Sequence, residues 1–295
     1  MPDPRRRGYA SGVALYEIIE RAELDAPVLV GALEGWVDAG GTASATVAFL
    51  TADSEEIAAF DTEALYDYRV NRPTLDIVDG TMQRLEWPAL TVRLVRNPKR
   101  ALLVLSGPEP HMRWKEFSAS VVDLALDLGA VGWVSLGAIA AAVPHTRATP
   151  LIATASKPEL LKEEDRLPPG LLRVPAAAIT TIELAFAEQG LPSVGFWAQV
   201  PHYIPEPYLP AVATILQRLA RHLGVELALD ELIQQGEAQR QKLNELVSQR
   251  PEAEAYLEQL ERMASTERVP SGEEIAAEVE RFLADQERGD NPFEG

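Results

Sequence analysis

The sequence predicts an α/β protein: a three-layer α/β/α sandwich with a mixed, mostly parallel sheet, followed by a C-terminal helical segment. Apolar runs of strand length alternate along the chain with segments whose apolar residues recur at helical spacing, the pattern of an α/β domain. After Gly224 this alternation stops and narrow helical stripes of apolar residues replace it. We therefore divide the chain into a flexible arm (1–12), an α/β/α domain (13–225) and an acidic helical segment (226–295).

The first strand, loop and helix lie between residues 28 and 50. An apolar run, Val28 to Leu33, precedes a loop with three glycines, Gly35, Gly40 and Gly41, and a small-residue helix begins near Thr42. Glycines allow positive φ, and their N–H groups can converge on an anion at a helix N-terminus, so these three are candidate ligand-binding residues. The alternative is a purely structural turn. Gly41 occupies the place of the P-loop lysine, which argues against nucleotide binding.

The remaining elements follow in order. Short apolar or alternating runs predict strands at 57–60, 66–73, 90–95, 101–105, 131–136, 151–155 and 194–200. Asp79-Gly80 is a turn signal and predicts a hairpin between residues 75–78 and 82–85. Helical spacing predicts helices at 117–128, 176–189 and 209–223, then helices on both sides of Pro251. Ser271 and Glu274 form a capping box for a last helix.

Composition excludes several classes of function. The net charge is −18, and residues 226–295 alone carry 18 acidic and seven basic residues, so the chain should repel nucleic acid. The sequence has no cysteine, which suits a reducing cytosol. No apolar run approaches the roughly 20 residues of a membrane span, and the basic start lacks the apolar core of a signal peptide. We expect a cytoplasmic protein without membrane contact.

Polar residues that follow the expected strands are the candidates for chemistry. The carboxyl ends of strands face the ligand crevice in open α/β sheets, and four candidate catalytic residues stand there: Asp38, Glu109, His145 and His202. Arg113 and Arg147 would bind an anionic ligand. The spacing does not suit a metal, and the sequence offers neither a cysteine nor a Gly-x-Ser-x-Gly nucleophile. The alternative is that these polar groups brace loops.

Five stretches in chain order resemble a known family. They are 34–41 (Glu-Gly-Trp-Val-Asp-Ala-Gly-Gly), 67–73 (Asp-Tyr-Arg-Val-Asn-Arg-Pro), 107–114, 136–147 and 190–203. The chain is similar to the bacterial branch of the proteasome assembly chaperone 2 family, whose members are sometimes labelled ATP-grasp-like. The resemblance implies a phosphorylase/hydrolase-like core and self-association, with a trimer favoured, and it implies no established activity. We expect no cofactor.

Two stretches depart from that family's pattern. Relatives carry a Tyr-x-Gly-Pro-Thr-Gly loop where this chain has Val174–Ile179, and the C-terminus lacks the hydrophobic-Tyr-x tail of the eukaryotic and archaeal chaperones. The function we expect is that of a non-catalytic, self-associating, chaperone-like protein. The alternative is a hydrolase or phosphorylase-like enzyme acting on a small anionic ligand at the strand ends. A third interpretation is an adaptor whose acidic C-terminal helices bind a protein client.

Overall fold

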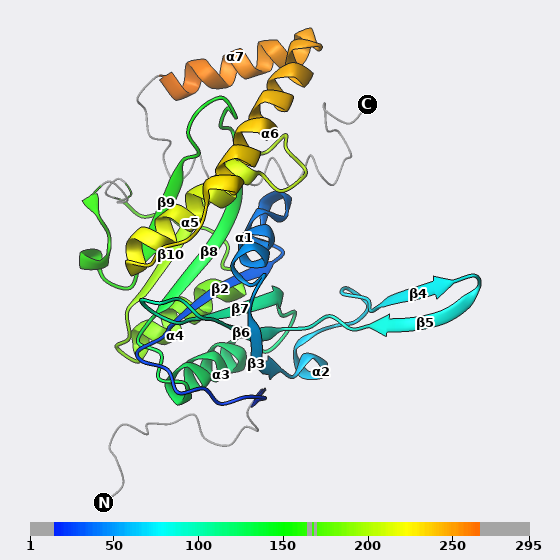
Figure 1. The fold of residues 1–295 in the computed structure, drawn as a ribbon. Coiled ribbons are helices and arrows are strands. Elements are labelled where there is room, and N and C mark those ends of the chain that lie inside the picture. The colour runs from blue at the N-terminus through cyan, green and yellow to red at the C-terminus, as the bar shows by residue number, and fades with distance from the viewer. Residues whose placement is uncertain (1–14, 164–166, 168–169, 266–295) are drawn as a thin grey trace, which may run out of the picture.

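An eight-stranded sheet crosses the centre of the protein in the computed structural model, which describes residues 15–163, 167 and 170–265 (Figure 1). Its strands lie in the order β1-β3-β6-β7-β2-β8-β10-β9. Their bounds are β1 Tyr16–Ile18, β2 Val28–Glu34, β3 Glu55–Phe60, β6 Thr91–Val95, β7 Leu102–Pro108, β8 Trp133–Ala141, β9 Leu151–Ala155 and β10 Ser193–Pro201. Every strand predicted from the apolar runs is present except one, and β1 was not predicted.

The four central strands, β7, β2, β8 and β10, are parallel neighbours, while β1, β6 and β9 run in the opposite direction. The central strands read as continuous apolar runs because both of their faces are covered. The mixed, mostly parallel sheet is therefore confirmed.

Helices cover the two faces of this sheet. One face packs on α1 (Thr42–Leu50) and α5 (Leu209–Leu223), and the other packs on α3 (Trp114–Asp127) and α4 (Ala178–Glu188). Each face has its own cluster of buried apolar side chains, with Val47 and Ile215 in one and Phe117 and Ile182 in the other. This arrangement confirms the three-layer α/β/α sandwich.

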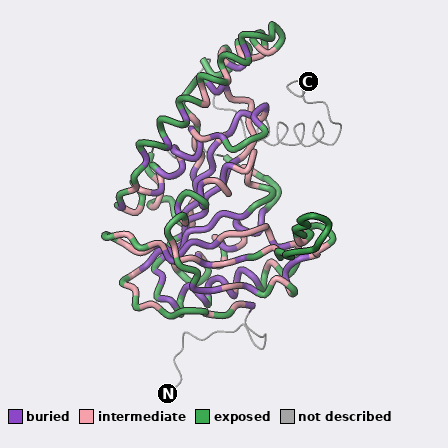
Figure 2. The backbone as a smooth tube through the Cα atoms, turned by 45° about the vertical axis from the view of Figure 1, so that its right-hand side comes forward, coloured by how far each residue is buried: buried purple, intermediate pink, exposed green. Residues whose placement is uncertain are grey.

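A second, two-stranded sheet projects away from the sandwich as an arm (Figure 1). Its strands are β4 (Thr74–Val78) and β5 (Thr81–Glu86), joined as predicted at Asp79 and Gly80. Both turn residues have positive φ, 50° and 77°, as a type I′ turn requires. Every residue of the two strands is exposed (Figure 2).

One sequence prediction was wrong: residues 66–73 form a loop rather than a strand. The Asp67 carboxylate accepts hydrogen bonds from the backbone N–H and the guanidinium of Arg69, and this local pairing folds the segment into a turn. The short helix α2 (Thr62–Leu65) precedes the loop, with Asp61 as its N-cap. Tyr66 and Tyr68 pack on the core cluster beneath this turn, whereas Val70 is exposed.

The acidic segment supplies two further helices, α6 (Asp230–Ser248) and α7 (Pro251–Ser265), which meet at the proline as predicted. Leu232 and Leu260 are buried within the same core cluster as α5. The α6–α7 segment therefore packs on the sandwich, and a domain boundary at 225 stays a prediction. The expected arm (1–12) and the capping box at Ser271 lie outside the described residues. None of the described helices has the length and apolarity to cross a membrane.

Candidate functional site

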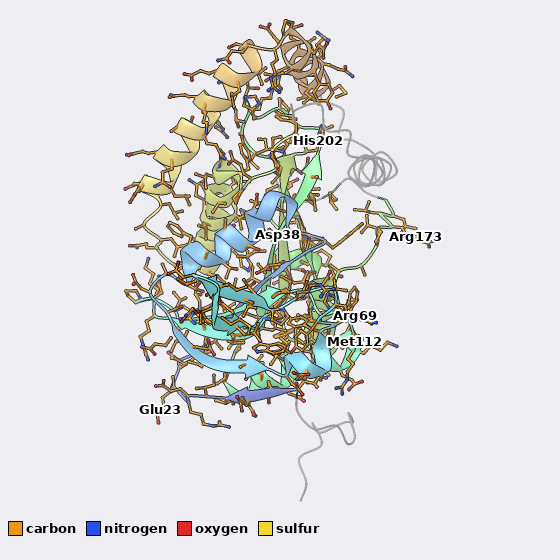
Figure 3. All side chains as sticks on the ribbon, turned by 90° about the vertical axis from the view of Figure 1, so that its right-hand side faces the viewer. Glu23, Asp38, Arg69, Met112, Arg173 and His202 are labelled. Carbon is orange, nitrogen blue, oxygen red and sulfur yellow. The ribbon has the colours of Figure 1, made fainter. Side chains whose placement is uncertain are left out.

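The carboxyl ends of β2, β7, β8 and β10 meet at one edge of the sheet, and each of the four predicted catalytic residues follows one of these strands. Asp38 and His202 are labelled at this end in Figure 3. The structure divides the four into two pairs. Asp38 and Glu109 lie on either side of the Gly35 loop, whereas His145 and His202 both lie against the ring of Tyr203.

The Asp38 carboxylate closes the N-terminus of α1. Its Oδ1 accepts the N–H groups of Ala43 at 2.6 Å and Ser44 at 3.1 Å, and its Oδ2 accepts the Ser44 hydroxyl. Gly41, with φ of 69°, turns the chain into the helix just before these donors. The predicted anion-binding loop therefore surrounds a carboxylate of the chain itself, which satisfies the free N–H groups of the first helical turn.

The Glu109 carboxylate accepts a backbone N–H group at the N-terminus of α4, as Asp38 does at α1. Its Oε1 accepts the Ala178 N–H at 2.5 Å, and the carboxylate also accepts the backbone N–H of Trp36. Burial raises the pKa of Glu109, and the two backbone hydrogen bonds oppose that rise. The segment Val174–Ile179, which departs from the family's glycine loop, thus leads into a helix whose N-terminus is already occupied by a side chain from the β7 end.

His145 is fully buried and has partners on both ring nitrogens. Its Nδ1 lies 2.7 Å from the Tyr203 hydroxyl, and its Nε2 lies 3.1 Å from Asn244 Oδ1 on α6. Burial lowers the pKa of the imidazole, although the hydrogen bond to Asn244 acts in the opposite direction. Burial thus disfavours the charged form of the ring, and Asn244 ties it to α6.

His202 is held in the same way. Its Nδ1 lies 3.2 Å from the Ala141 carbonyl oxygen, and its Nε2 lies 3.2 Å from the hydroxyl of Tyr256 on α7. Both histidines thus bridge a strand-end loop to one of the C-terminal helices. These contacts are those of the loop-bracing alternative, and a catalytic role for either histidine stays a prediction.

The two predicted anion-binding arginines have carboxylate partners. Arg113, the N-cap of α3 with φ of 58°, donates from Nε to Glu116 Oε2 at 3.0 Å. Arg147 donates from Nε to Glu261 Oε2 at 2.5 Å, and the same glutamate accepts the Thr146 hydroxyl. Among the described residues, no group of three or more His, Asp and Glu side chains is placed to hold a metal ion.

Sequence reasoning missed the residues that complete these loops. The Tyr208 hydroxyl donates to the His145 carbonyl oxygen at 3.1 Å, and Arg240 donates to that hydroxyl at 3.3 Å and to the Arg147 carbonyl at 3.2 Å. Asn244 and Glu261 stand about a hundred positions after their partners in the chain. No local sequence signal links side chains so far apart.

A buried carboxyl group was also missed. Glu183 of α4 points onto the sheet, where it interacts with the hydroxyls of Ser135 and Thr154. Two indoles donate to those hydroxyls, Trp133 to Ser135 at 2.6 Å and Trp197 to Thr154 at 2.9 Å. Within the described part of the chain, Glu183 Oε1 is buried without a hydrogen-bond partner. Burial raises the pKa of this carboxyl to about 7.

Glycine makes room for that carboxyl group. A Cβ added to Gly195 in β10 would lie 2.5 Å from Glu183 Oε1 and 2.6 Å from Thr154 Oγ1. The sheet can therefore accept the acid from α4 only because this strand position has no side chain.

The family model and the solved structures that resemble this chain agree with one another. The model of the PAC2 family matches residues 32–247. A Mycobacterium tuberculosis protein of unknown function is 32% identical, with a TM-score of 0.82, and the match covers 95% of this chain and 99% of that one. A proteasome-assembly chaperone homologue from the same organism is 35% identical, with a TM-score of 0.72 and coverage of 78% and 99%.

A PAC2 family protein from Streptomyces avermitilis is 34% identical, with a TM-score of 0.70 and coverage of 78% and 99%. The archaeal proteasome activator PbaB from Pyrococcus furiosus, 13% identical with a TM-score of 0.63, shares the fold. A search of the curated proteins finds no match.

Proposed function

Since the chain belongs to the PAC2 family, we propose that it is a non-catalytic, self-associating protein with a role like that of the proteasome-assembly chaperone homologues it resembles. We further propose that it works in the cytoplasm. The observation that carries the proposal is the β4–β5 arm, which presents apolar side chains to solvent on a ribbon that projects from the sandwich (Figure 1).

The β4–β5 arm is energetically unfavourable in an isolated chain. Apolar residues pair across it, Leu75 with Leu85 and Ile77 with Met82, yet Ile77 is 60% exposed and Met82 is 73% exposed. A two-stranded ribbon without a covering layer is marginally stable in water, and clustered exposed apolar side chains mark interaction sites. Contact with a neighbouring protomer would cover them.

The position of the arm favours a ring. The arm extends away from its own sandwich, and we propose that it contacts the sandwich of the neighbouring protomer; a heterologous contact of this kind closes into a ring when the rotation allows. We prefer a trimer, as the family resemblance suggests.

The strand-end residues support the non-catalytic part of the proposal. Asp38 and Glu109 are engaged at helix N-termini, and His145 and His202 are engaged by α6 and α7. The alternative, a hydrolase or phosphorylase-like enzyme for a small anionic ligand, has less support because the guanidinium groups of the two candidate arginines are already paired with carboxylates.

Light scattering on purified protein tests the assembly. We expect the wild type to have a mass about three times that of the 32.2 kDa chain, and the double variant Ile77→Asp, Met82→Asp to have the mass of one chain, because charges on the arm oppose its burial. Leu184→Asp is the matched control, since Leu184 is 66% exposed on α4, away from the arm. A wild type of single-chain mass at every concentration would contradict the proposal.

A protein client belongs to the same proposal, with the C-terminal helices as its binding surface. The outer faces of α6 and α7 carry exposed carboxylates, among them Glu245, Glu252 and Glu254. Such a surface suits a basic partner. Charge reversal of these three residues should abolish capture of that partner while leaving the mass of the assembly unchanged.

A further inference from the structure

A groove of about 310 Å³ runs along α1 over the end of the sheet where the carboxyl termini of β2 and β7 lie beside the start of β6. Its floor includes Ala32 and Gly107, and its walls carry polar side chains from both the helix and the strands. This volume is at the lower end of the range for small-molecule sites in proteins. None of the residues predicted from sequence as catalytic or ligand-binding lines it.

The groove begins at the switch point of the sheet. β2 continues toward α1 on one face, whereas its neighbour β7 continues into α3 on the other face. Connections that leave in opposite directions open a crevice between the carboxyl ends of two adjacent strands, and ligands of open α/β sheets bind there. The main chain at this point is fixed, because the Glu109 N–H donates to the Glu34 carbonyl oxygen at 2.9 Å.

Three polar side chains face the groove from the strands. Ser106 and Thr91 are cross-strand neighbours, and Glu34 ends β2 beside them. Among the residues that the structure describes, no hydrogen bond or ion pair engages the Glu34 carboxylate or these two hydroxyls. Ser44 and Thr51 add hydroxyls from α1, although Ser44 already donates to Asp38 and Thr51 to the Val47 carbonyl.

The negative charge of the groove favours a cationic ligand. Glu34 is its only charged lining residue in the described part of the chain, and the charge that acts on Glu34 is that of another carboxylate, Asp38. Partial burial, and then the charge of Asp38, raise the pKa of Glu34. The attraction of a bound cation to the Glu34 carboxylate would offset both effects, whereas an anion would meet two negative charges.

We propose that this groove binds a small hydroxylated amine, with the ammonium group on the Glu34 carboxylate and the hydroxyl groups on Ser106 and Thr91. A charge-assisted hydrogen bond fixes the amine at the strand end. The neighbouring hydroxyls both donate and accept, as binding a polyol requires. This inference is independent of self-association, since the groove and the β4–β5 arm share no residue.

Isothermal titration calorimetry with two matched pairs, glucosamine against glucose and serinol against glycerol, tests the proposal on the full chain. We expect at least one amine to bind about tenfold more tightly than its neutral analogue, the range of a hydrogen bond to a charged group. Glu34→Gln should remove this difference, and Thr91→Val should weaken both members of the pair. Added salt should weaken only the amine.

Glu17→Gln is the control, because Glu17 is an exposed glutamate on β1 at the far edge of the sheet. It should bind as the wild type does. Circular dichroism of each variant checks that the isosteric changes leave the fold intact. Equal binding of amine and neutral analogue, no binding of either amine, or unchanged amine binding in Glu34→Gln would each overturn the proposal.

Discussion

Glu183 provides the sharpest test of the packing described above, because its carboxyl group is buried between α4 and the sheet and has one oxygen without a partner. The folded protein should hold a proton there that the unfolded chain releases at a lower pH. Replacing Glu183 by Gln keeps the size and the hydrogen-bonding capacity of the side chain and removes its ionisation.

The expected magnitude follows from the pKa. Burial raises it from 4.5 to about 7, which corresponds to about 3 kcal/mol between the two protonation states. Below pH 4.5 both folded and unfolded chains carry the proton, so the stability contribution is greatest there. As the pH rises toward 7 the unfolded chain loses the proton first, and the free energy of unfolding therefore falls. Above pH 7 the loss is complete.

Urea unfolding followed by tryptophan fluorescence measures this effect, since Trp133 and Trp197 belong to the same network. The free energy of unfolding of Glu183→Gln minus that of the wild type should grow by about 2–3 kcal/mol between pH 5 and pH 8. Glu188→Gln, an exposed change on the same helix, should show no such trend. A difference that stays constant with pH would refute the reasoning.

Three further outcomes are expected. Asp38→Ala should cost about 1–2 kcal/mol in urea unfolding because α1 loses its cap; an unchanged midpoint would contradict this. His145→Ala should cost about 1–3 kcal/mol by the same measurement, since it leaves buried partners unsatisfied, and full stability would show that the ring does not brace its loop. Deleting 226–295 should lower the melting temperature by roughly 5 °C or more, because Leu232 and Leu260 leave the core; an unaltered melting curve would establish the segment as separable.

The sequence predicted the parts of this fold that depend on local pattern. The apolar runs located the central strands, helical spacing located α5 to the residue, and Asp79-Gly80 located the hairpin turn. The segment 66–73 was misread because alternation alone does not reveal an aspartate that binds its own neighbour's guanidinium. Sequence also placed the candidate polar residues at the strand ends, which parallel topology dictates.

The sequence alone did not predict the roles of those residues. Asp38 becomes a helix cap only through the turn at Gly41, and Glu109 caps a helix that begins 69 positions later. The burial of the Glu183 carboxyl group on α4 depends on Gly195 in β10. Tertiary packing determines these contacts, and the spacing of the residues along the chain does not predict them.

The hydrogen bonds from α6 and α7 to the strand-end loops also bear on how the protein is made. Asn244 lies 99 residues after His145, and Glu261 lies 114 residues after Arg147. At the usual rate of synthesis, an interval of roughly 5–20 s separates the appearance of a loop from that of its partner. Every strand of the sheet precedes these helices in the chain, so the sheet can form first. During that interval a nascent chain carries His145 without its partner on α6.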